Sequence, residues 1–353
     1  MPAGASRQRF FWPPLQFGEP RIEYIDFYGT NIDVRRGGET WLEEVVLGKE
    51  EAKNIFSRPK DLASDGQGRL FVTDVDRQVV FVLDLVHHKV RNILSDSGGP
   101  LQLGFPGGID IARDGDVYVV DSGSRWVCVV GRDERSTRRF GGEHLVRPTG
   151  IAVDSERGRV YVVDTGAHSV VAFDFAGNYL WTLGQRGEGP GEFNFPLDAD
   201  VGPDGNLYVL DAMNARVQVF DADGGYLRSF GSRGAAEGRF QMAKALAVSP
   251  SGHVYVTDSQ ANCFNIYSLE GDFLLRVGGT SFVAGAEIAP GGFYLPQGID
   301  VDANETVWVV DSLNRLVHRF QYLNEKYLAA HPILPGQAAS PEVMRGFPKD
   351  VGK

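Results

Sequence analysis

A short apolar motif that ends in aspartate recurs six times along the chain. The copies are RLFVTD, DVYVVD, RVYVVD, NLYVLD, HVYVTD and TVWVVD, and they end at Asp74, Asp121, Asp164, Asp211, Asp258 and Asp311. Neighbouring copies lie 43 to 53 residues apart. A period of this length indicates one supersecondary unit used repeatedly, and it constrains the fold more than any other feature of the sequence.

Each unit reads as four short strands. The first strand starts at a proline in five units and at Ala243 in the fifth; the prolines are Pro59, Pro106, Pro148, Pro196 and Pro296. A proline is tolerated at a strand start, because the missing N–H costs little there. The second strand ends at the repeated aspartate, the third starts six residues later, and the fourth reads YLWTLG, YLRSFG or FLLRVG in units three to five. This repeat predicts an all-β fold, a six-bladed β-propeller of four-stranded antiparallel blades.

The sixth unit lacks a clear fourth strand, and the N-terminal segment supplies a candidate. YIDFYG at residues 24–29 matches YLRSFG at residues 226–231. We therefore expect an N-terminal outer strand to close the ring by pairing with residues 316–321, which removes an open sheet edge. The expected organisation is an N-terminal tail at 1–20, the propeller at 21–334 and a C-terminal tail at 335–353. The composition of residues 40–53 favours a short helical insertion.

Charge and composition exclude several classes of protein. The net charge of −11 repels phosphate backbones, so we expect no nucleic-acid partner. Two cysteines, Cys128 and Cys263, cannot build a disulfide framework. The chain contains no apolar run long enough to span a bilayer. The N-terminal residues show no signal-peptide core, although an earlier signal could have been removed.

The repeat resembles that of the NHL family, whose units have a Phe-x-x-Pro start, an apolar strand ending in Asp, and an Asn and an Arg in the next loop. Blade four matches best, with FNFP at Phe193–Pro196 and with Asn214 and Arg216. The N-terminal FFWPPLQFGEPRIEYI is similar to the start of exported bacterial NHL-repeat proteins. This resemblance implies a periplasmic or extracellular location, with the cytoplasm as the alternative. A removed signal that carried a lipid anchor would add peripheral membrane association.

The first strands carry aspartates in alternate blades. IDI, ADV and IDV place Asp110, Asp200 and Asp300 in blades two, four and six, whereas the other blades have Ala63, Ala152 and Ala247. Because the first strand of a propeller blade is innermost, we expect the three carboxylates at one level of the central channel. Oxygen ligands suit a hard cation, so the sequence predicts a calcium site. The alternative is a set of carboxylates bound to water or to neighbouring backbone. No other cofactor is expected.

A second candidate site lies on the face formed by the loops that follow the second strands and precede the first strands. Arginine and aromatic residues are frequent at binding hot spots. The candidate partner-binding residues are Arg77, Arg125, Trp126, His168, Arg216 and Arg315. Part of this pattern has a structural explanation, since Asn-x-Arg loops recur in the family.

Two functions remain open. The first is a non-enzymatic protein-binding scaffold or sensor that uses the loop-rich face. The alternative is a propeller enzyme of the lyase or lactonase type, with Lys60, Asp61, Asp198 and Lys244 at the channel mouth. The related amidating lyases carry zinc on three histidines, one of which commonly stands directly after the repeat proline. The corresponding residues here are Lys60, Gly107, Thr149, Leu197, Lys244 and Gln297, and none is histidine. The repeated aspartates are interpreted as structural, because a role needed in every blade is an architectural one.

Overall fold

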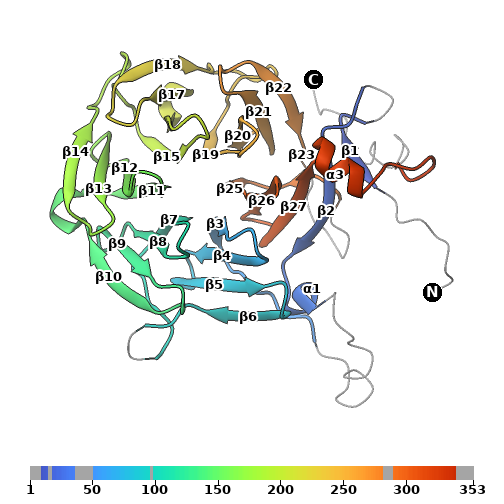
Figure 1. Ribbon diagram of the computed structural model, residues 1–353, viewed down its shortest axis with the longest axis horizontal. Helices are drawn as coiled ribbons and strands as arrows, with labels where there is room; N and C mark the ends of the chain where they lie inside the picture. The colour runs from blue at the N-terminus through green and yellow to red at the C-terminus, as the bar shows by residue number, and fades with distance from the viewer. Residues whose placement is uncertain (1–8, 15–17, 36–50, 96–97, 281–288, 339–353) are drawn as a thin grey trace.

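A computed structural model of the chain shows a closed ring of six sheets around a central channel (Figure 1). It describes residues 9–14, 18–35, 51–95, 98–280 and 289–338. Each sheet is one propeller blade, and its first strand lies nearest the axis. The fold class predicted from the repeat is therefore confirmed.

The first three blades each contain four antiparallel strands in chain order. Blade one consists of β3 (Pro59–Ser64), β4 (Arg69–Asp74), β5 (Val79–Asp84) and β6 (Lys89–Asn92). Blade two consists of β7 (Pro106–Ile111), β8 (Val117–Asp121), β9 (Trp126–Val130) and β10 (Ser136–Phe140). Blade three consists of β11 (Pro148–Asp154), β12 (Arg159–Asp164), β13 (Ser169–Asp174) and β14 (Tyr179–Leu183).

Blades four and five repeat this order, and blade six draws on both ends of the chain. Blade four consists of β15 (Pro196–Val201), β16 (Leu207–Asp211), β17 (Arg216–Phe220) and β18 (Tyr226–Phe230). Blade five consists of β19 (Ala243–Val248), β20 (His253–Asp258), β21 (Cys263–Ser268) and β22 (Phe273–Val277). Blade six consists of β25 (Pro296–Val301), β26 (Thr306–Asp311), β27 (Leu316–Tyr322), β2 (Ile22–Tyr28) and β1 (Phe10–Trp12).

Strand β2 closes the ring as the sequence predicted. It runs antiparallel to β27, with Tyr24 opposite Phe320 and Tyr28 opposite Val317. Strand β1 then pairs with the outer side of β2, so blade six has a fifth strand. Sequence analysis placed residues 10–12 in a tail, because three residues before a Pro-Pro pair are too few to show strand alternation.

Helices and loops fill the remaining described chain. The short helices are α1 (Asn31–Arg35), α3 (Glu325–Ala330) and the 3-10 turns η1 (Gly142–His144) and η2 (Ala212–Asn214). Two short strands, β23 (Gly279–Thr280) and β24 (Gly292–Phe293), pair in the loop before blade six. Most of the helix expected at 40–53 lies outside the described residues, as does the C-terminal tail beyond residue 338. In the described part of the chain, no helix has the length and apolar character of a membrane span.

Apolar side chains of neighbouring blades pack together to form the core. Between blades three and four, for example, Ala152, Tyr161, Phe193 and Val209 belong to one buried cluster. Full burial of a large apolar side chain contributes about 1.5–3 kcal/mol, so each seam between blades is a substantial source of stability. Second strands are buried along almost their whole length, which explains their continuous Val, Tyr and Leu content.

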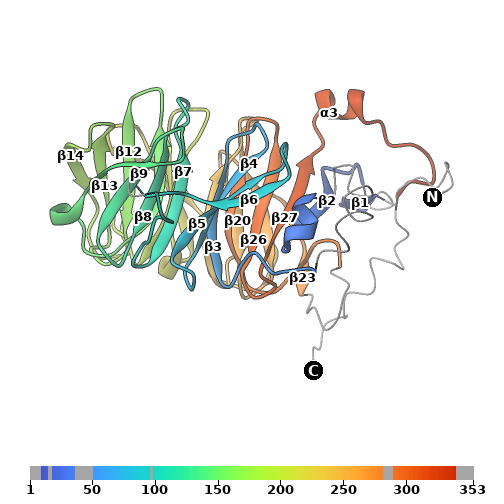
Figure 2. The same ribbon diagram turned by 90° about the horizontal axis from the view of Figure 1, so that it is seen from below.

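The ring has two different faces, seen edge-on in Figure 2. We call the side that carries the loops after the second strands and the loops between blades the loop face; β23 lies on this side. The other side, toward which α3 lies, carries tight turns between strands one and two and between strands three and four, and we call it the turn face. The channel connects the two.

The six repeated aspartates fix the loop face. Asp258 accepts hydrogen bonds from the backbone N–H groups of Gln241 and Met242, at 2.6 and 3.0 Å, in the loop before its own blade. It also accepts from Gln260 and Ala261 in the loop that follows it. Asp74 and Asp164 bind their two loops in the same manner. The structural interpretation of this series is therefore supported by its contacts.

Candidate functional site

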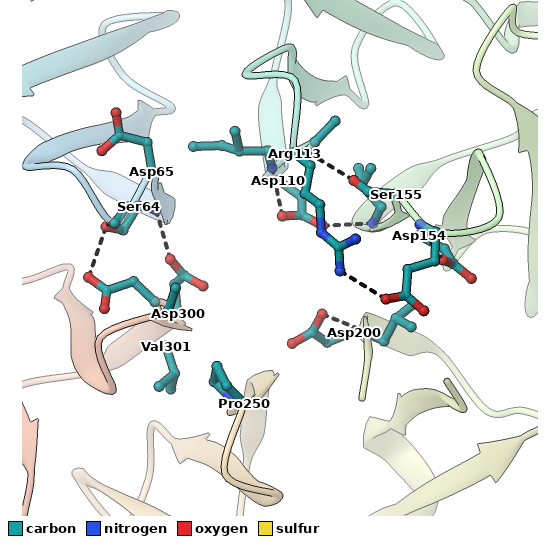
Figure 3. A pocket seen from close by; sticks show the side chains of 18 of the residues that line it. Ser64, Asp65, Asp110, Arg113, Asp154, Ser155, Asp200, Pro250, Asp300 and Val301 are labelled. Atoms are coloured by element: carbon teal, nitrogen blue, oxygen red, sulfur yellow. Dashed lines mark hydrogen bonds and ion pairs between the residues drawn. The ribbon is translucent and has the colours of Figure 1, made fainter. Parts of the chain in front are cut away.

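The channel contains a ring of three carboxylates at one level of the innermost strands. Asp110, Asp200 and Asp300 come from β7, β15 and β25 and point toward the same cavity (Figure 3). Their positions follow from strand geometry, because alternate residues of an innermost strand face the channel. The structure thus brings the three aspartates together.

Each of these carboxylates spans the seam to the next blade. Asp110 accepts the N–H of Val153, Asp200 accepts that of Val248, and Asp300 accepts that of Ser64, each at 2.7 Å. The three donors directly follow Ala152, Ala247 and Ala63, the alanines of the alternate blades. Each aspartate is therefore bonded to the residue that directly follows the alanine of the next blade.

The channel widens toward the turn face into a cavity of about 700 Å³, lined by these three carboxylates and by the turns around Ser64, Arg113 and Ser155. Toward the loop face it narrows to a space of about 30 Å³, which Asp61 and Asp198 also line. A space of that size holds one or two water molecules. Five carboxylates therefore line this smaller space.

Burial weakens the acidity of these groups. It raises the pKa of Asp200 to about 6 and that of Asp300 to about 7, against an ordinary value of 3.8. The pKa of Asp110 lies well above its usual range because of burial and because of the nearby charge of Asp200. Backbone hydrogen bonds oppose the rise in all three, since they favour the ionised form.

The calcium site remains a prediction. Among the residues that the structure describes, no three His, Cys, Asp or Glu side chains form a group that could hold one metal ion. Both oxygens of Asp110 and of Asp200 accept backbone N–H groups, so part of their lone-pair capacity is already used. A cation at this level would have to use the remaining lone pairs.

A second charged cluster lies nearer the loop face. Lys60 and Lys244 directly follow the first residues of β3 and β19, and the Lys60 ammonium donates to Gln297 Oε1 at 3.0 Å. One residue further along β3, Asp61 accepts the N–H of Ile109 at 3.2 Å. Asp198 accepts that of Leu246 at 3.0 Å. The four charged residues named in the enzyme hypothesis therefore lie in the part of the channel nearest the loop face.

Burial also shifts the pKa values of this cluster. It lowers the pKa of Lys60, against the opposing effect of the Asp61 and Asp198 charges. Burial and the Lys60 charge lower the pKa of Lys244. The pKa of Asp198 is raised to about 7, again mainly by burial. Such shifts accompany both functional sites and structural charge networks.

Five of the six predicted partner-binding residues lie on the surface of the loop face. Arg77, Arg125 and Arg315 are exposed, His168 is half-buried, and Trp126 is 39% exposed. The Trp126 ring packs on the backbone of Gly142, where no side chain would fit between them. These residues remain candidates for partner binding.

Arg216 differs from the other five, because its side chain is largely buried. Its guanidinium lies inside the loop before blade four, where it donates to Asp211 at 2.9 Å and to the carbonyls of Gly189 and Glu192 at 2.8 and 2.9 Å. These contacts direct the guanidinium into its own loop. The physical role of Arg216 is to hold that loop to the repeated aspartate.

Sequence analysis missed a ring of residues that surrounds the channel mouth. These residues directly precede the first strands: Arg58, Phe105, Arg147, Phe195, Met242 and Leu295. Three of them are large apolar side chains left in solvent, with Phe105 45%, Phe195 38% and Met242 46% exposed. The repeated proline could have revealed the ring, because each member occupies the position just before it.

Several contacts hold Phe195 in this mouth ring. The backbone N–H of Phe195 donates to His168 Nδ1 at 3.1 Å, and the two rings are 4.5 Å apart. The Arg147 guanidinium lies 5.9 Å from the same phenyl ring. Phe195 has φ 50°, a left-handed conformation that is strained for a residue with a side chain. The fold therefore holds this aromatic side chain in solvent against a local backbone cost.

Comparison with known proteins agrees with this architecture. A family described as a six-bladed beta-propeller matches residues 150–230. The Drosophila melanogaster protein brain tumor is 26% identical over 131 residues, which are 36% of this chain and 12% of that protein. E3 ubiquitin-protein ligase NHLRC1 of Rattus norvegicus is 40% identical over 63 residues, 18% of this chain and 16% of that protein. The chain thus matches only a small part of the length of these curated relatives.

Solved structures resemble about three quarters of the chain. A structural genomics protein of unknown function from Bacteroides thetaiotaomicron has a TM-score of 0.61 at 19% identity, covering 77% of this chain and 71% of that one. Virginiamycin B lyase from Staphylococcus aureus, solved with quinupristin, has a TM-score of 0.52 at 13% identity, covering 78% and 85%. At these identities the likeness shows the fold alone.

Fold and repeat together define the class of protein, a six-bladed β-propeller. Within that class, residues of this chain are similar to parts of the NHLRC1 and brain tumor proteins.

Proposed function

We propose that this propeller is a non-catalytic protein-binding scaffold or sensor and that its loop face docks on the partner. The observation that carries the proposal is the exposed apolar surface around the channel mouth. Besides Phe105, Phe195 and Met242, it includes Val146, Met213 and Leu313 from neighbouring loops, each about half exposed. Clustered apolar side chains rimmed by polar residues are typical of interaction sites.

Rigidity supports the same function. The repeated aspartates bind the backbone on which the mouth ring stands, including the N–H groups of Phe105, Arg147 and Met242. A surface held in one conformation loses little entropy when a partner docks. Apolar side chains that served only the fold would stabilise it more if they were buried.

Charge indicates the kind of partner. The chain carries a net charge of −11, yet the exposed arginines Arg58, Arg77, Arg125, Arg147 and Arg315 gather on the loop face. Complementary charge steers association and selects partners, so we expect an acidic partner surface. The NHLRC1 relatives are named E3 ubiquitin-protein ligases, an activity that acts on proteins. That name supports a protein partner here without assigning the activity.

Site-specific photocrosslinking tests this proposal. A photoreactive phenylalanine analogue at Phe195 or Met242 should capture one and the same protein in the source organism. Val86 is 60% exposed on the turn face and gives a matched control position, which should not capture it. Equal capture from Val86, or unrelated products from the two loop-face positions, would remove the loop face as the docking surface.

Arg125 and Trp126 provide a second measurement on the same complex. Arg125→Ala and Trp126→Ala should weaken capture, because truncation of Arg and aromatic anchors often costs about 2 kcal/mol or more of binding. A circular-dichroism melt of each variant separates binding from folding. If both variants capture the partner fully, these two residues lie outside the interface.

We further propose export to the periplasm or cell exterior, on the resemblance of the N-terminal segment to exported bacterial NHL-repeat proteins. Fractionation of cells that express the full-length gene checks this proposal. A removed lipid-carrying signal predicts recovery with membranes after high-salt washing. Recovery only in the cytoplasmic fraction would contradict export.

A second candidate function rests on the cluster of Lys60, Asp61, Asp198 and Lys244. Lowered lysine pKa values and a raised aspartate pKa are features of acid–base and amine catalysis, so the lyase or lactonase hypothesis keeps a physical basis. The probe is trapping of a small aldehyde with borohydride. Preferential labelling of Lys60 over the exposed Lys89 would favour an enzyme, and equal labelling would count against it.

A further inference from the structure

We propose that the partner inserts an acidic side chain into the channel mouth, where its carboxylate binds between Lys60 and Lys244. This inference rests on the proposed function and adds the chemistry of the contact. The end of the channel at the loop face would then be a pocket for one carboxylate, surrounded by the mouth ring. Asp, Glu and a C-terminal carboxylate share this chemistry.

The two lysines lie on one side of the mouth. Lys60, Lys244 and Gln297 occupy the same position in their strands, immediately after the first residue of β3, β19 and β25. These strands belong to blades one, five and six, which are consecutive around the closed ring. At the same level, the other three blades carry Gly107, Thr149 and Leu197, which have no charge. At this level the channel is therefore cationic on one side only.

Both ammonium groups have donors left for a ligand. Lys60 donates to Gln297 Oε1, and the Gln297 amide donates in turn to Ser259 Oγ at 3.1 Å, which fixes the amide orientation. Within the described residues, Lys244 has no hydrogen bond or ion pair that satisfies its ammonium group. An ammonium group carries three N–H donors, so a carboxylate could accept from both lysines at once.

Electrostatics favours a ligand with a single negative charge. The Lys60 and Lys244 charges repel each other, and a carboxylate between them would offset that repulsion. Asp61 and Asp198 lie deeper in the channel, where they accept hydrogen bonds from the backbone of neighbouring blades. Their charges raise the pKa of Lys60, against the effect of burial. A dianion such as a phosphate group would meet those two carboxylates. The mouth therefore fits a carboxylate better than a phosphate.

The mouth ring would strengthen this contact. Phe105, Phe195 and Met242 stand two residues before the lysine level, at the ends of the loops that lead into their strands. A partner segment that covers them would exclude water from the mouth, and charge interactions strengthen as the local dielectric constant falls. We therefore expect the inserted acid to be flanked by apolar residues.

The test uses peptides of defined sequence on the intact chain. A random 12-residue phage library is selected on the wild-type protein, and the enriched peptides are synthesised and measured by fluorescence anisotropy. We expect an Asp or Glu next to apolar residues in the enriched sequences. Replacing that acid by its amide should weaken binding at least about tenfold, as for a desolvated charge pair.

Protein variants complete a double-mutant cycle. Lys244→Gln should weaken the binding of the acidic peptide by a similar factor. It should not further weaken the binding of the amide peptide. Lys89→Gln changes an exposed lysine on the outer strand β6 and should leave both affinities unchanged. Thermal melts verify that the variants fold. Lys60→Gln should have the same effect as Lys244→Gln, and Lys60→Arg, which keeps the charge, should bind the acidic peptide more tightly than Lys60→Gln. If Lys60→Gln does not fold, the cycle uses Lys244→Gln alone.

Several results would overturn the inference. Selection without an acidic consensus, or unchanged affinity of the acidic peptide for Lys244→Gln, would exclude carboxylate insertion. Tighter binding after the acid is replaced by phosphoserine would assign the mouth to phosphate instead. None of these results would affect crosslinking from Phe195 and Met242, so failure of the insertion is distinguishable from failure of the loop-face proposal.

Discussion

The Asp110 carboxylate of blade two accepts the backbone N–H of Val153 in blade three, across the seam between two innermost strands. Asp200 and Asp300 repeat this contact to Val248 and Ser64. Three alternate seams of the ring are thus pinned by a carboxylate that also faces the channel. The same carboxylates have raised pKa values, so the charge of the groups that join the blades changes with pH.

The pH dependence of stability follows from this link. The pKa of Asp200 and Asp300 rises to about 6 and about 7 in the folded chain, above the ordinary value of 3.8. Between these limits the folded state binds more protons than the unfolded state, so stability falls as pH rises from about 4 to about 7. One unit of pKa shift corresponds to about 1.4 kcal/mol, so we expect a drop of a few kcal/mol.

Thermal melts from pH 4.5 to 8 check this prediction. The triple variant Asp110→Asn, Asp200→Asn, Asp300→Asn should show a flatter pH profile, whatever its absolute stability. Asp114→Asn alters an exposed carboxylate at the cavity rim and should keep the wild-type profile. A wild-type melting temperature that rises steadily across this range would contradict the assignment.

Calcium gives a separate prediction for the same residues. If the three carboxylates bind Ca²⁺, the ion should raise the unfolding free energy by mass action, by about 2.7 kcal/mol at a hundredfold excess over Kd, and so raise the melting temperature. The triple Asn variant should lose this increase, and Asp114→Asn should retain it. A calcium titration without any shift of the wild-type melting temperature would remove the metal and leave the hydrogen bonds between blades as the role of these groups.

Ring closure predicts a strong dependence on the N-terminal strand. Removal of residues 1–30 should lower the melting temperature sharply, because it uncovers β27 and removes the buried Ile22 and Tyr28. A chain that starts at residue 9 keeps β1 and β2 and serves as the control. The point variant Ile22→Ala should cost about 2–4 kcal/mol of unfolding free energy, measured by denaturant titration. An unchanged melting temperature in the longer deletion would disprove closure by β2.

Arg216 and Arg315 should differ in what they stabilise. Arg216→Met removes an ion pair whose Asp211 side chain is fully buried, so we expect a loss of about 3 kcal/mol of stability. Arg315→Ala changes an exposed side chain and should stay within about 0.5 kcal/mol of the wild type. Denaturant titrations measure both. Equal losses would show that Arg315 also has a structural role.

The architecture could be predicted from sequence because the repeat encodes it locally. Strand alternation, turn residues and the proline recur within each unit, so the blade can be recognised without knowledge of its neighbours. The closing strand was also recognisable, since residues 24–29 match the outer strand of blade four. Strand β1 was not, because it has only three residues.

The site was harder to predict because its contacts join different repeats. The bond from Asp110 to Val153 crosses 43 residues, and no local pattern shows which backbone donor lies opposite. Arg216 and Arg315 look alike in sequence, yet they differ by one position after the repeated aspartate. The left-handed residue of that turn is Ala215 in one blade and Arg315 in the other, at φ 53° and 59°. Arg315 therefore lies in the turn and points to solvent, whereas Arg216 starts the next strand and points inward.

The closure of the ring by strands from both chain ends has a consequence for biosynthesis. Tyr28 on β2 and Arg319 on β27 are partners separated by 291 residues. At translation rates of roughly 5–20 residues per second, the closing strand emerges from the ribosome about 15 to 60 seconds before its partner strand exists. During that interval, the nascent chain carries an unpaired β2 segment and a partial ring. Completion of the propeller must then coincide with release of the last blade, so a ribosome that stalls before β27 would leave an open ring as a substrate for chaperones and proteases.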